Sequence, residues 1–240
     1  MLDLGHAPWL VGVADRPAAV ARAAALPPEA RPFDVVEARL DLFAAPTLDG
    51  CERACAALER SGTPVLITLR STAQGGRFAQ SEGERLSCFR RALAHASWAD
   101  VEDDAAIVPD VAALVAHRPD GQLVISHHDF ARTPPLSELL AVADRARAVA
   151  GAITKIATAV KTNEDREVLF ELLARRPDRT CVIGMGSSEA LRIELGARGS
   201  LLVYGYLEAP TAPGQLSASE THARLRVAVP GYARRKPASP

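Results

Sequence analysis

The sequence predicts a single (β/α)8 TIM barrel, in which eight parallel strands alternate with helices. Strand-like and helix-like segments alternate along most of the 240 residues, and the connections between them are short. Eight such units are present, and eight is the number of strands that closes a barrel of this kind. The competing architecture, a doubly wound open sheet, would place a glycine-rich phosphate loop after the first strand. The sequence instead has Ala14-Asp15-Arg16-Pro17 at that point.

Short apolar runs bounded by polar or turn-forming residues mark the strands. They predict strands over 9–13, 33–39, 64–69, 98–102, 123–126, 153–157, 180–184 and 200–204. Helices are expected between them, over about 16–25, 49–60, 82–96, 109–117, 137–149 and 188–197. A further helix follows the sixth strand, where Thr162 or Asn163 can cap it and Glu164 and Asp165 place negative charge in its first turn. We expect one domain over 1–229 and a disordered tail over 230–240, which carries three prolines and a short basic cluster.

Composition argues against several classes of partner. The net charge of −1 and the aromatic content of 5% give no reason to expect a nucleic acid or an anionic membrane surface. No apolar run reaches the roughly 18 residues that a membrane-spanning helix needs. The N-terminus lacks the pattern of a signal peptide. The four cysteines form neither C-x-x-C nor Cys/His metal spacings, so we expect free thiols, no metal and a cytoplasmic location.

Lys155 is an unusual residue in its surroundings. It lies inside the apolar sixth strand, in a chain that contains three lysines and 25 arginines. Lysine is rarely buried unless it is paired or used chemically. Unlike arginine, an ammonium in apolar surroundings can lose its proton, and the neutral amine can attack a carbonyl. The alternative is a structural lysine, paired with a buried carboxylate or extending from the strand end.

Polar residues stand at the carboxyl ends of the expected strands, which form the active-site face of a barrel. Glu37, Arg39 and Asp41 are spaced two residues apart, so they share the inner face of the second strand. Buried charges are costly unless they pair with each other or hold a polar ligand, so a structural ion-pair network is the alternative here. Two further pairs end the third and fourth strands, namely Thr68 with Arg70 and Asp100 with Glu102.

Histidines end the fifth strand, at His127 and His128. One of them should face the barrel axis and the other should turn away. Histidine titrates near neutral pH and is the most frequent general acid or base, although a lone histidine is more often only hydrogen-bonded. A buried lysine on the next strand favours the catalytic interpretation. After the last strand, the Pro/Gly loop 211–215 can form either a lid over the barrel or an ordinary surface loop.

Six stretches, in order, resemble the motifs of the type I 3-dehydroquinate dehydratases, Schiff-base enzymes of the shikimate pathway. The resemblance runs from about residue 33 to residue 215 and so covers most of the chain. The stretches are Glu37-Ala38-Arg39-Leu40-Asp41; Thr68-Leu69-Arg70 followed by Gly75-Gly76; Ser126 and His128-Asp129-Phe130 followed by Thr133-Pro134; Thr154-Lys155-Ile156-Ala157; Arg192 followed by Gly199-Ser200; and Ala212-Pro213-Gly214-Gln215.

This resemblance implies a lyase that converts 3-dehydroquinate to 3-dehydroshikimate, the third step of the shikimate pathway and part of aromatic amino acid biosynthesis. Lys155 would form the imine and His128 would act as base and acid, with no metal or organic cofactor. Arg192 would bind the substrate carboxylate. The hydroxyls would be held by Glu37, Arg39, Arg70 and Gln215. Thr211 would be a further substrate-binding residue. The family pattern also implies a homodimer.

Three positions depart from the family's pattern. Gln74 stands where the family usually has glutamate, which keeps the shape but loses the charge. The segment before Arg192 is one residue shorter, with Leu191 in place of a serine. Thr211 replaces the serine that opens the lid motif and keeps its hydroxyl.

Two other functions remain as alternatives. One is another lysine-dependent barrel enzyme, such as a class I aldolase. It would need a phosphate site after the last two strands, where Gly184-Met185-Gly186 is only a weak candidate. The other is a non-catalytic sensor of a quinate-type ligand. The departure at Gln74 supports a sensor, whereas the retention of Lys155 and His128 argues against one.

Overall fold

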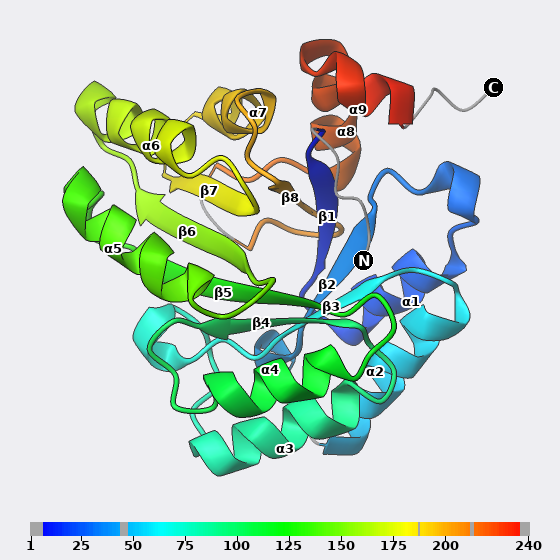
Figure 1. Cartoon of the computed structure of the whole chain (residues 1–240). Helices are drawn as coiled ribbons and strands as arrows, with labels where there is room; N and C mark the ends of the chain where they lie inside the picture. Colours follow the sequence, from blue (N-terminus) through cyan, green and yellow to red (C-terminus); the bar gives the residue numbers. More distant parts are fainter. Residues whose placement is uncertain (1–6, 44–47, 187, 212–213, 236–240) are drawn as a thin grey trace.

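The computed structural model describes residues 7–43, 48–186, 188–211 and 214–235. Within them, eight parallel strands form one sheet that curves into a nearly closed barrel, with helices around its outside (Figure 1). The strands are β1 Trp9–Ala14, β2 Val35–Arg39, β3 Val65–Thr68, β4 Trp98–Glu102, β5 Gln122–Asp129, β6 Ile153–Ala159, β7 Thr180–Met185 and β8 Leu202–Tyr206. The α-helices are α1 Pro17–Ala25, α2 Leu48–Arg60, α3 Glu82–Ala92, α4 Val108–Ala116, α5 Leu136–Arg147, α6 Asn163–Arg175, α7 Glu189–Ala197, α8 Ala218–Ala228 and α9 Pro230–Arg235. Short 3-10 helices are η1 Pro28–Ala30, η2 Leu40–Leu42 and η3 Thr72–Gln74.

The barrel closes between β7 and β8, the first and last strands in the pairing order. Neighbours pair in the order β7-β6-β5-β4-β3-β2-β1-β8, so β7 and β8 are the ends of the ladder. Leu201 N donates to Thr180 O over 2.8 Å, and Val182 N donates to Ser200 Oγ over 2.9 Å, which holds these ends together. The predicted (β/α)8 barrel is therefore confirmed.

Side chains alternate between the barrel interior and the helix layer, as the period of a strand requires. Val35 belongs to the cluster that fills the barrel, whereas Val36 and Ala38 pack with the helix-side cluster. Glu37 and Arg39 consequently face inward, toward the barrel mouth. The predicted inward direction of Glu37 and Arg39 is confirmed. Both faces of a parallel strand are buried, and the apolar face of this one packs against the helices.

All eight predicted strands are present, with shifted ends. β5 extends to Asp129, so both histidines lie within the strand rather than after it. α3 ends at Ala92, before the predicted end at residue 96. Helix α8 was not among the predicted helices, although Ser217 and Glu220 form a capping box at its start.

The C-terminal segment differs from the sequence-based expectation. Residues 230–235, expected to be disordered, form helix α9, and residues 236–240 lie outside the described residues. Tyr232 is fully buried and its hydroxyl lies 2.9 Å from His222 Nδ1. Arg235 pairs with Asp34 at 3.1 Å and lies over the Trp9 ring. Pro230 starts the helix, where a missing N–H costs nothing. None of the helices in the described residues has the length and apolar character needed to cross a membrane.

Candidate active site

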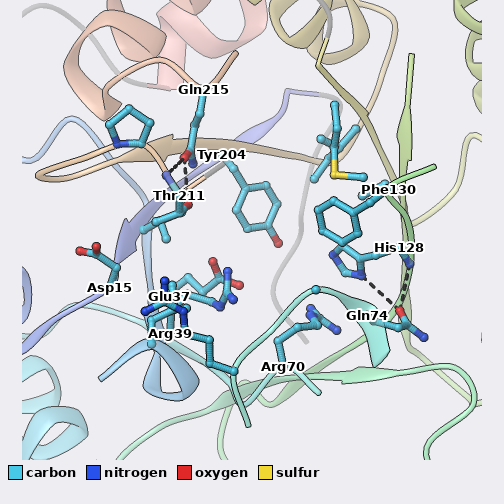
Figure 2. Close-up of a pocket in the computed structure, with 18 of the residues that line it drawn as sticks. Asp15, Glu37, Arg39, Arg70, Gln74, His128, Phe130, Tyr204, Thr211 and Gln215 are labelled. Atoms are coloured by element: carbon cyan, nitrogen blue, oxygen red, sulfur yellow. Dashed lines mark hydrogen bonds between the residues drawn. The ribbon is translucent and has the colours of Figure 1, made fainter. Parts of the chain in front are cut away.

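A cavity of about 690 Å³ lies at the carboxyl ends of the strands (Figure 2). Its walls come from side chains on β1, β2, β5, β6, β7 and β8 and from the loops that follow the strands. All eight site residues predicted from the sequence line it. They are Glu37, Arg39, Arg70, His128, Lys155, Arg192, Thr211 and Gln215.

Lys155 is buried in the wall of this cavity and is paired with acidic groups. Its side chain is 5% exposed, and Nζ donates to Asp100 Oδ2 over 2.9 Å. Glu37 Oε1 lies 3.9 Å from Nζ, and the ring of Tyr204 has its centroid 4.3 Å away. The lysine therefore has the buried carboxylate partner of the structural alternative, while it also opens onto a polar cavity.

Asp100 is held as a charged carboxylate below Lys155. Arg70 Nη2 donates to Asp100 Oδ1 over 2.8 Å, and Ser126 Oγ donates to the same oxygen over 2.5 Å. Burial raises the pKa of Asp100, but the positive charges of Arg70 and Lys155 lower it by a larger amount, so the net shift of this pKa is downward. Asp100 therefore stays ionised. At neutral pH it is a poor acceptor for a proton.

His128 has the opposite electrostatic character. Burial lowers the pKa of His128 well below its usual value, and the positive charges of Arg70 and Lys155 lower it further. The imidazole is therefore neutral at neutral pH and can accept a proton.

Gln74 fixes how the His128 ring is protonated. Its Oε1 accepts from the backbone N–H of His128 over 2.9 Å, and its Nε2 donates to Asp104 Oδ1 over 3.0 Å (Figure 2). These two contacts orient the amide, with its oxygen toward the histidine. His128 Nδ1 lies 3.3 Å from that oxygen, so it carries the hydrogen in this contact. Nε2 is then left with the free lone pair.

The neighbouring histidine turns away from the cavity, as predicted. His127 Nδ1 lies 3.0 Å from Asp103 Oδ1 on the outer side of the barrel. The hydrogen bond that His127 donates to Asp103 raises the pKa of His127, and burial opposes this effect. The two histidines therefore differ in pKa direction, because His128 is buried and faces cations, whereas His127 hydrogen-bonds to a carboxylate.

Glu37 and Arg39 are partly engaged with protein groups. Arg39 forms a two-pronged contact with Asp41, through bonds of 2.9 and 2.8 Å. Glu37 Oε1 accepts from Thr68 Oγ1 over 2.7 Å. The ion-pair alternative is thus realised for Arg39 and Asp41, and Arg39 still faces the cavity (Figure 2).

Arg192 and the loop after β8 form the other side of the cavity. Arg192 lies in the first half of α7, and its Nε donates to Gly214 O over 2.9 Å. Burial lowers the pKa of Arg192 to about 10. Thr211 donates from N and Oγ1 to Gln215 Oε1, over 2.8 and 2.9 Å (Figure 2). Ala212 and Pro213 of the predicted lid lie outside the described residues.

Several groups at this site are not evident from the sequence. The sequence marks Asp100 only as one of a polar pair at the end of the fourth strand, and its pairing with Lys155 depends on barrel curvature. Tyr204 lines the cavity and was overlooked, although strand alternation from Leu202 would have placed it inward. Within the described residues, no group of three or more His, Cys, Asp or Glu could hold a metal ion.

Comparisons with known proteins agree on one family. The family model described as "Type I 3-dehydroquinase" matches residues 14–228. A curated 3-dehydroquinate dehydratase of Methanocella arvoryzae is 33% identical over 195 residues, covering 81% of this chain and 87% of the relative. A crystal structure of 3-dehydroquinate dehydratase from Geobacillus kaustophilus is similar, with a TM-score of 0.80 and 25% identity, over 93% of this chain and 91% of that one. The Aquifex aeolicus enzyme gives a TM-score of 0.80 at 22% identity, over 91% and 98% of the two chains.

Proposed function

Because the chain belongs to the type I 3-dehydroquinase family, we propose that it dehydrates 3-dehydroquinate to 3-dehydroshikimate through an imine on Lys155. This is the third step of the shikimate pathway. The observation that carries the proposal is the position of Lys155 Nζ. It is buried against Asp100 in the wall of the same cavity that His128 lines.

Lys155 supplies the electron sink of the reaction. After Lys155 gives a proton to neutral His128, its amine attacks the ketone carbon. His128 returns that proton to the hydroxyl of the resulting carbinolamine, so that water leaves and a protonated imine forms. The positive nitrogen makes the neighbouring C–H bond far more acidic than it is beside a ketone. Asp100 carries a lasting negative charge 2.9 Å from Nζ, which stabilises the protonated imine.

His128 moves the protons. In its neutral form it takes the proton from the carbon next to the imine, and the electron pair moves toward the nitrogen as an enamine. The enamine then expels the hydroxyl group two carbons from the imine, and His128 returns its proton so that water leaves. A carbon–carbon double bond forms, the imine is restored, and hydrolysis by water releases the product ketone and Lys155.

The remaining polar groups hold the substrate. We assign the carboxylate to Arg192, whose planar fork matches a carboxylate with two parallel hydrogen bonds. A bound carboxylate would also offset the burial that lowers the pKa of Arg192. We assign the hydroxyls to Glu37, Arg39, Arg70 and Gln215, and we include Thr211 among the substrate-binding residues. This chemistry needs no metal or organic cofactor, since the lysine imine accepts the electrons.

We also propose that the protein works in the cytoplasm as a homodimer, on the basis of the family resemblance. Light scattering coupled to size-exclusion chromatography at micromolar concentration tests the dimer, which should give twice the chain mass of 25.5 kDa. A single species at the chain mass would contradict it.

Borohydride reduction tests the imine. Incubation with 3-dehydroquinate should produce the enone absorbance of 3-dehydroshikimate. Borohydride added during turnover should leave a stable adduct that peptide mapping locates on Lys155. Lys155→Arg keeps the charge but removes the nucleophile, so it should abolish both turnover and adduct.

Lys161→Arg is the matched control, because it changes an exposed lysine six residues further along the chain. It should retain both turnover and adduct. Turnover of 3-dehydroquinate by Lys155→Arg, or an adduct on Lys161 in the wild type, would contradict the assignment. Absence of turnover by the wild type would contradict the proposed activity itself.

A further inference from the structure

Tyr204 places a polar atom in the active-site cavity without a protein partner. The side chain comes from β8 and is 5% exposed, and it lines the cavity. Among the described residues its hydroxyl is one of the few buried polar side-chain atoms that lack a hydrogen bond. Figure 2 shows the hydroxyl pointing into the cavity, away from the strand that carries the ring.

A buried hydroxyl without a partner destabilises a folded protein, because it gives up its hydrogen bonds to water. Phenylalanine would fill the same space without that cost. The other buried tyrosine in the described residues, Tyr232, has His222 Nδ1 2.9 Å from its hydroxyl. The unpartnered hydroxyl of Tyr204 is therefore more readily explained by a ligand than by packing.

The surroundings of Tyr204 determine what kind of partner it can bind. Burial raises the pKa of Tyr204 well above its usual value, and the negative charges of Glu37 and Asp100 add to this effect. The phenol therefore keeps its proton and acts as a hydrogen-bond donor. Such a donor binds an oxygen acceptor.

The ring position places this donor beside the reacting centre. Lys155 Nζ lies 4.3 Å from the centroid of the Tyr204 ring, a contact that favours a positive charge on the nitrogen. Because the hydroxyl is rigidly attached to this ring, it lies close to the nitrogen that would carry the imine. A substrate held there as an imine presents several oxygens within the same space.

We propose that Tyr204 is a substrate-contacting residue whose hydroxyl donates a hydrogen bond to an oxygen of the bound substrate, while its ring faces the nitrogen of Lys155. This inference rests on the proposed function and adds a residue to it. It predicts that the hydroxyl contributes to the reaction but not to the stability of the free protein.

Tyr204→Phe separates these two contributions. The variant keeps the ring and removes only the hydroxyl, so borohydride should still trap substrate on Lys155. We expect kcat/KM to fall on the order of tenfold, the effect of losing one hydrogen bond and leaving its acceptor unpaired. The melting temperature should stay the same or rise, because an unpartnered buried hydroxyl has been removed. Tyr206→Phe, on the same strand but outside the cavity lining, is the control and should leave kcat/KM unchanged.

Titration with quinate measures the same contact without chemistry. Quinate retains the carboxylate and has a hydroxyl in place of the ketone, so it cannot form an imine. Its Kd should weaken in Tyr204→Phe by a factor similar to the loss in kcat/KM. Values of kcat/KM and quinate Kd within twofold of the wild type would overturn the inference, as would a loss of activity accompanied by a lower melting temperature. A wild type that binds quinate but does not dehydrate 3-dehydroquinate would contradict the proposed activity, and the Kd comparison would still decide the role of Tyr204.

Discussion

At the scale of single residues, His128 contacts the amide of Gln74, and that amide is in turn hydrogen-bonded to the carboxylate of Asp104. Gln74 presents its oxygen to the histidine and its nitrogen to Asp104. The amide therefore orients the imidazole ring but places no net charge beside it. A carboxylate at position 74 would add a negative charge beside His128 and another beside Asp104.

Exchanging the two groups isolates the effect of charge on the base. Gln74→Glu favours the imidazolium and should raise the pKa of His128. Because the free base is needed, the acidic limb of the kcat profile should then move to higher pH. Gln74→Glu combined with Asp104→Asn keeps an amide–carboxylate hydrogen bond, and it should show the same shift without repulsion between two carboxylates. The measurement is kcat between pH 5 and 9 for both variants; a limb that stays in place in both would contradict the electrostatic role of position 74.

The sequence was informative at this scale wherever a residue acts through its strand position. The strand residues of the predicted site meet in one cavity, because alternation and the common active-site end of the strands determine where they point. Arg192, Thr211 and Gln215 lie outside the strands and were identified only by the family resemblance. Partners across the barrel were less accessible. The contact between Lys155 on β6 and Asp100 on β4 joins strands that are not hydrogen-bonded neighbours.

At the scale of elements, the glycine pair after β3 sets how closely the following loop packs. Gly75 has a φ of 78°, in the left-handed region that favours glycine. A Cβ on Gly76 would lie 2.1 Å from the backbone oxygen of Arg70. The loop could not keep its path with any larger residue at position 76, so Gln74 would move relative to His128.

Gly76→Ala should consequently destabilise the fold. We expect a loss of about 1–3 kcal/mol in the free energy of unfolding, the usual range for overpacking. Gly83→Ala is a matched control: Gly83 lies in α3 and a Cβ there meets nothing within 4 Å. It should be neutral or stabilise by up to about 1 kcal/mol. Urea unfolding of both variants provides the measurement, and equal stabilities would contradict the close approach at Gly76.

At the scale of the whole molecule, the two histidines at the end of β5 should affect the pH dependence of global stability in opposite directions. The pKa of His128 is lowered by folding, so below about pH 6.5 the unfolded chain binds a proton that the folded protein does not. This destabilises the fold as the pH falls from about 6.5 toward the folded-state pKa, by at most about 1.4 kcal/mol per pH unit. The pKa of His127 is raised, so its contribution is present below about pH 6.5 and is lost as the pH rises through its folded-state pKa.

Unfolding free energies measured from pH 7.5 to 5 test this difference. His128→Asn should flatten the decline in stability toward acid, because asparagine binds no proton in either the folded or the unfolded chain. His127→Asn should make the decline steeper, since the contact with Asp103 gains strength in acid. Comparing slopes rather than absolute stabilities removes the constant cost of each substitution. Parallel slopes for the wild type and both variants would refute the assigned pKa directions.

The sequence by itself determined the barrel and which of the strand residues at the site face its axis. These follow from local rules, namely the alternation of side chains along a strand and the short connections between parallel strands. The tertiary structure alone decided the environment of each group. The pairing of Lys155 with Asp100, the neutral state of His128 and the unpartnered hydroxyl of Tyr204 depend on charges and burial contributed by strands far apart in the chain. Helix α9 illustrates the same limit: Pro230 and the basic residues suggested a tail, whereas Tyr232 and Arg235 find partners on distant parts of the chain.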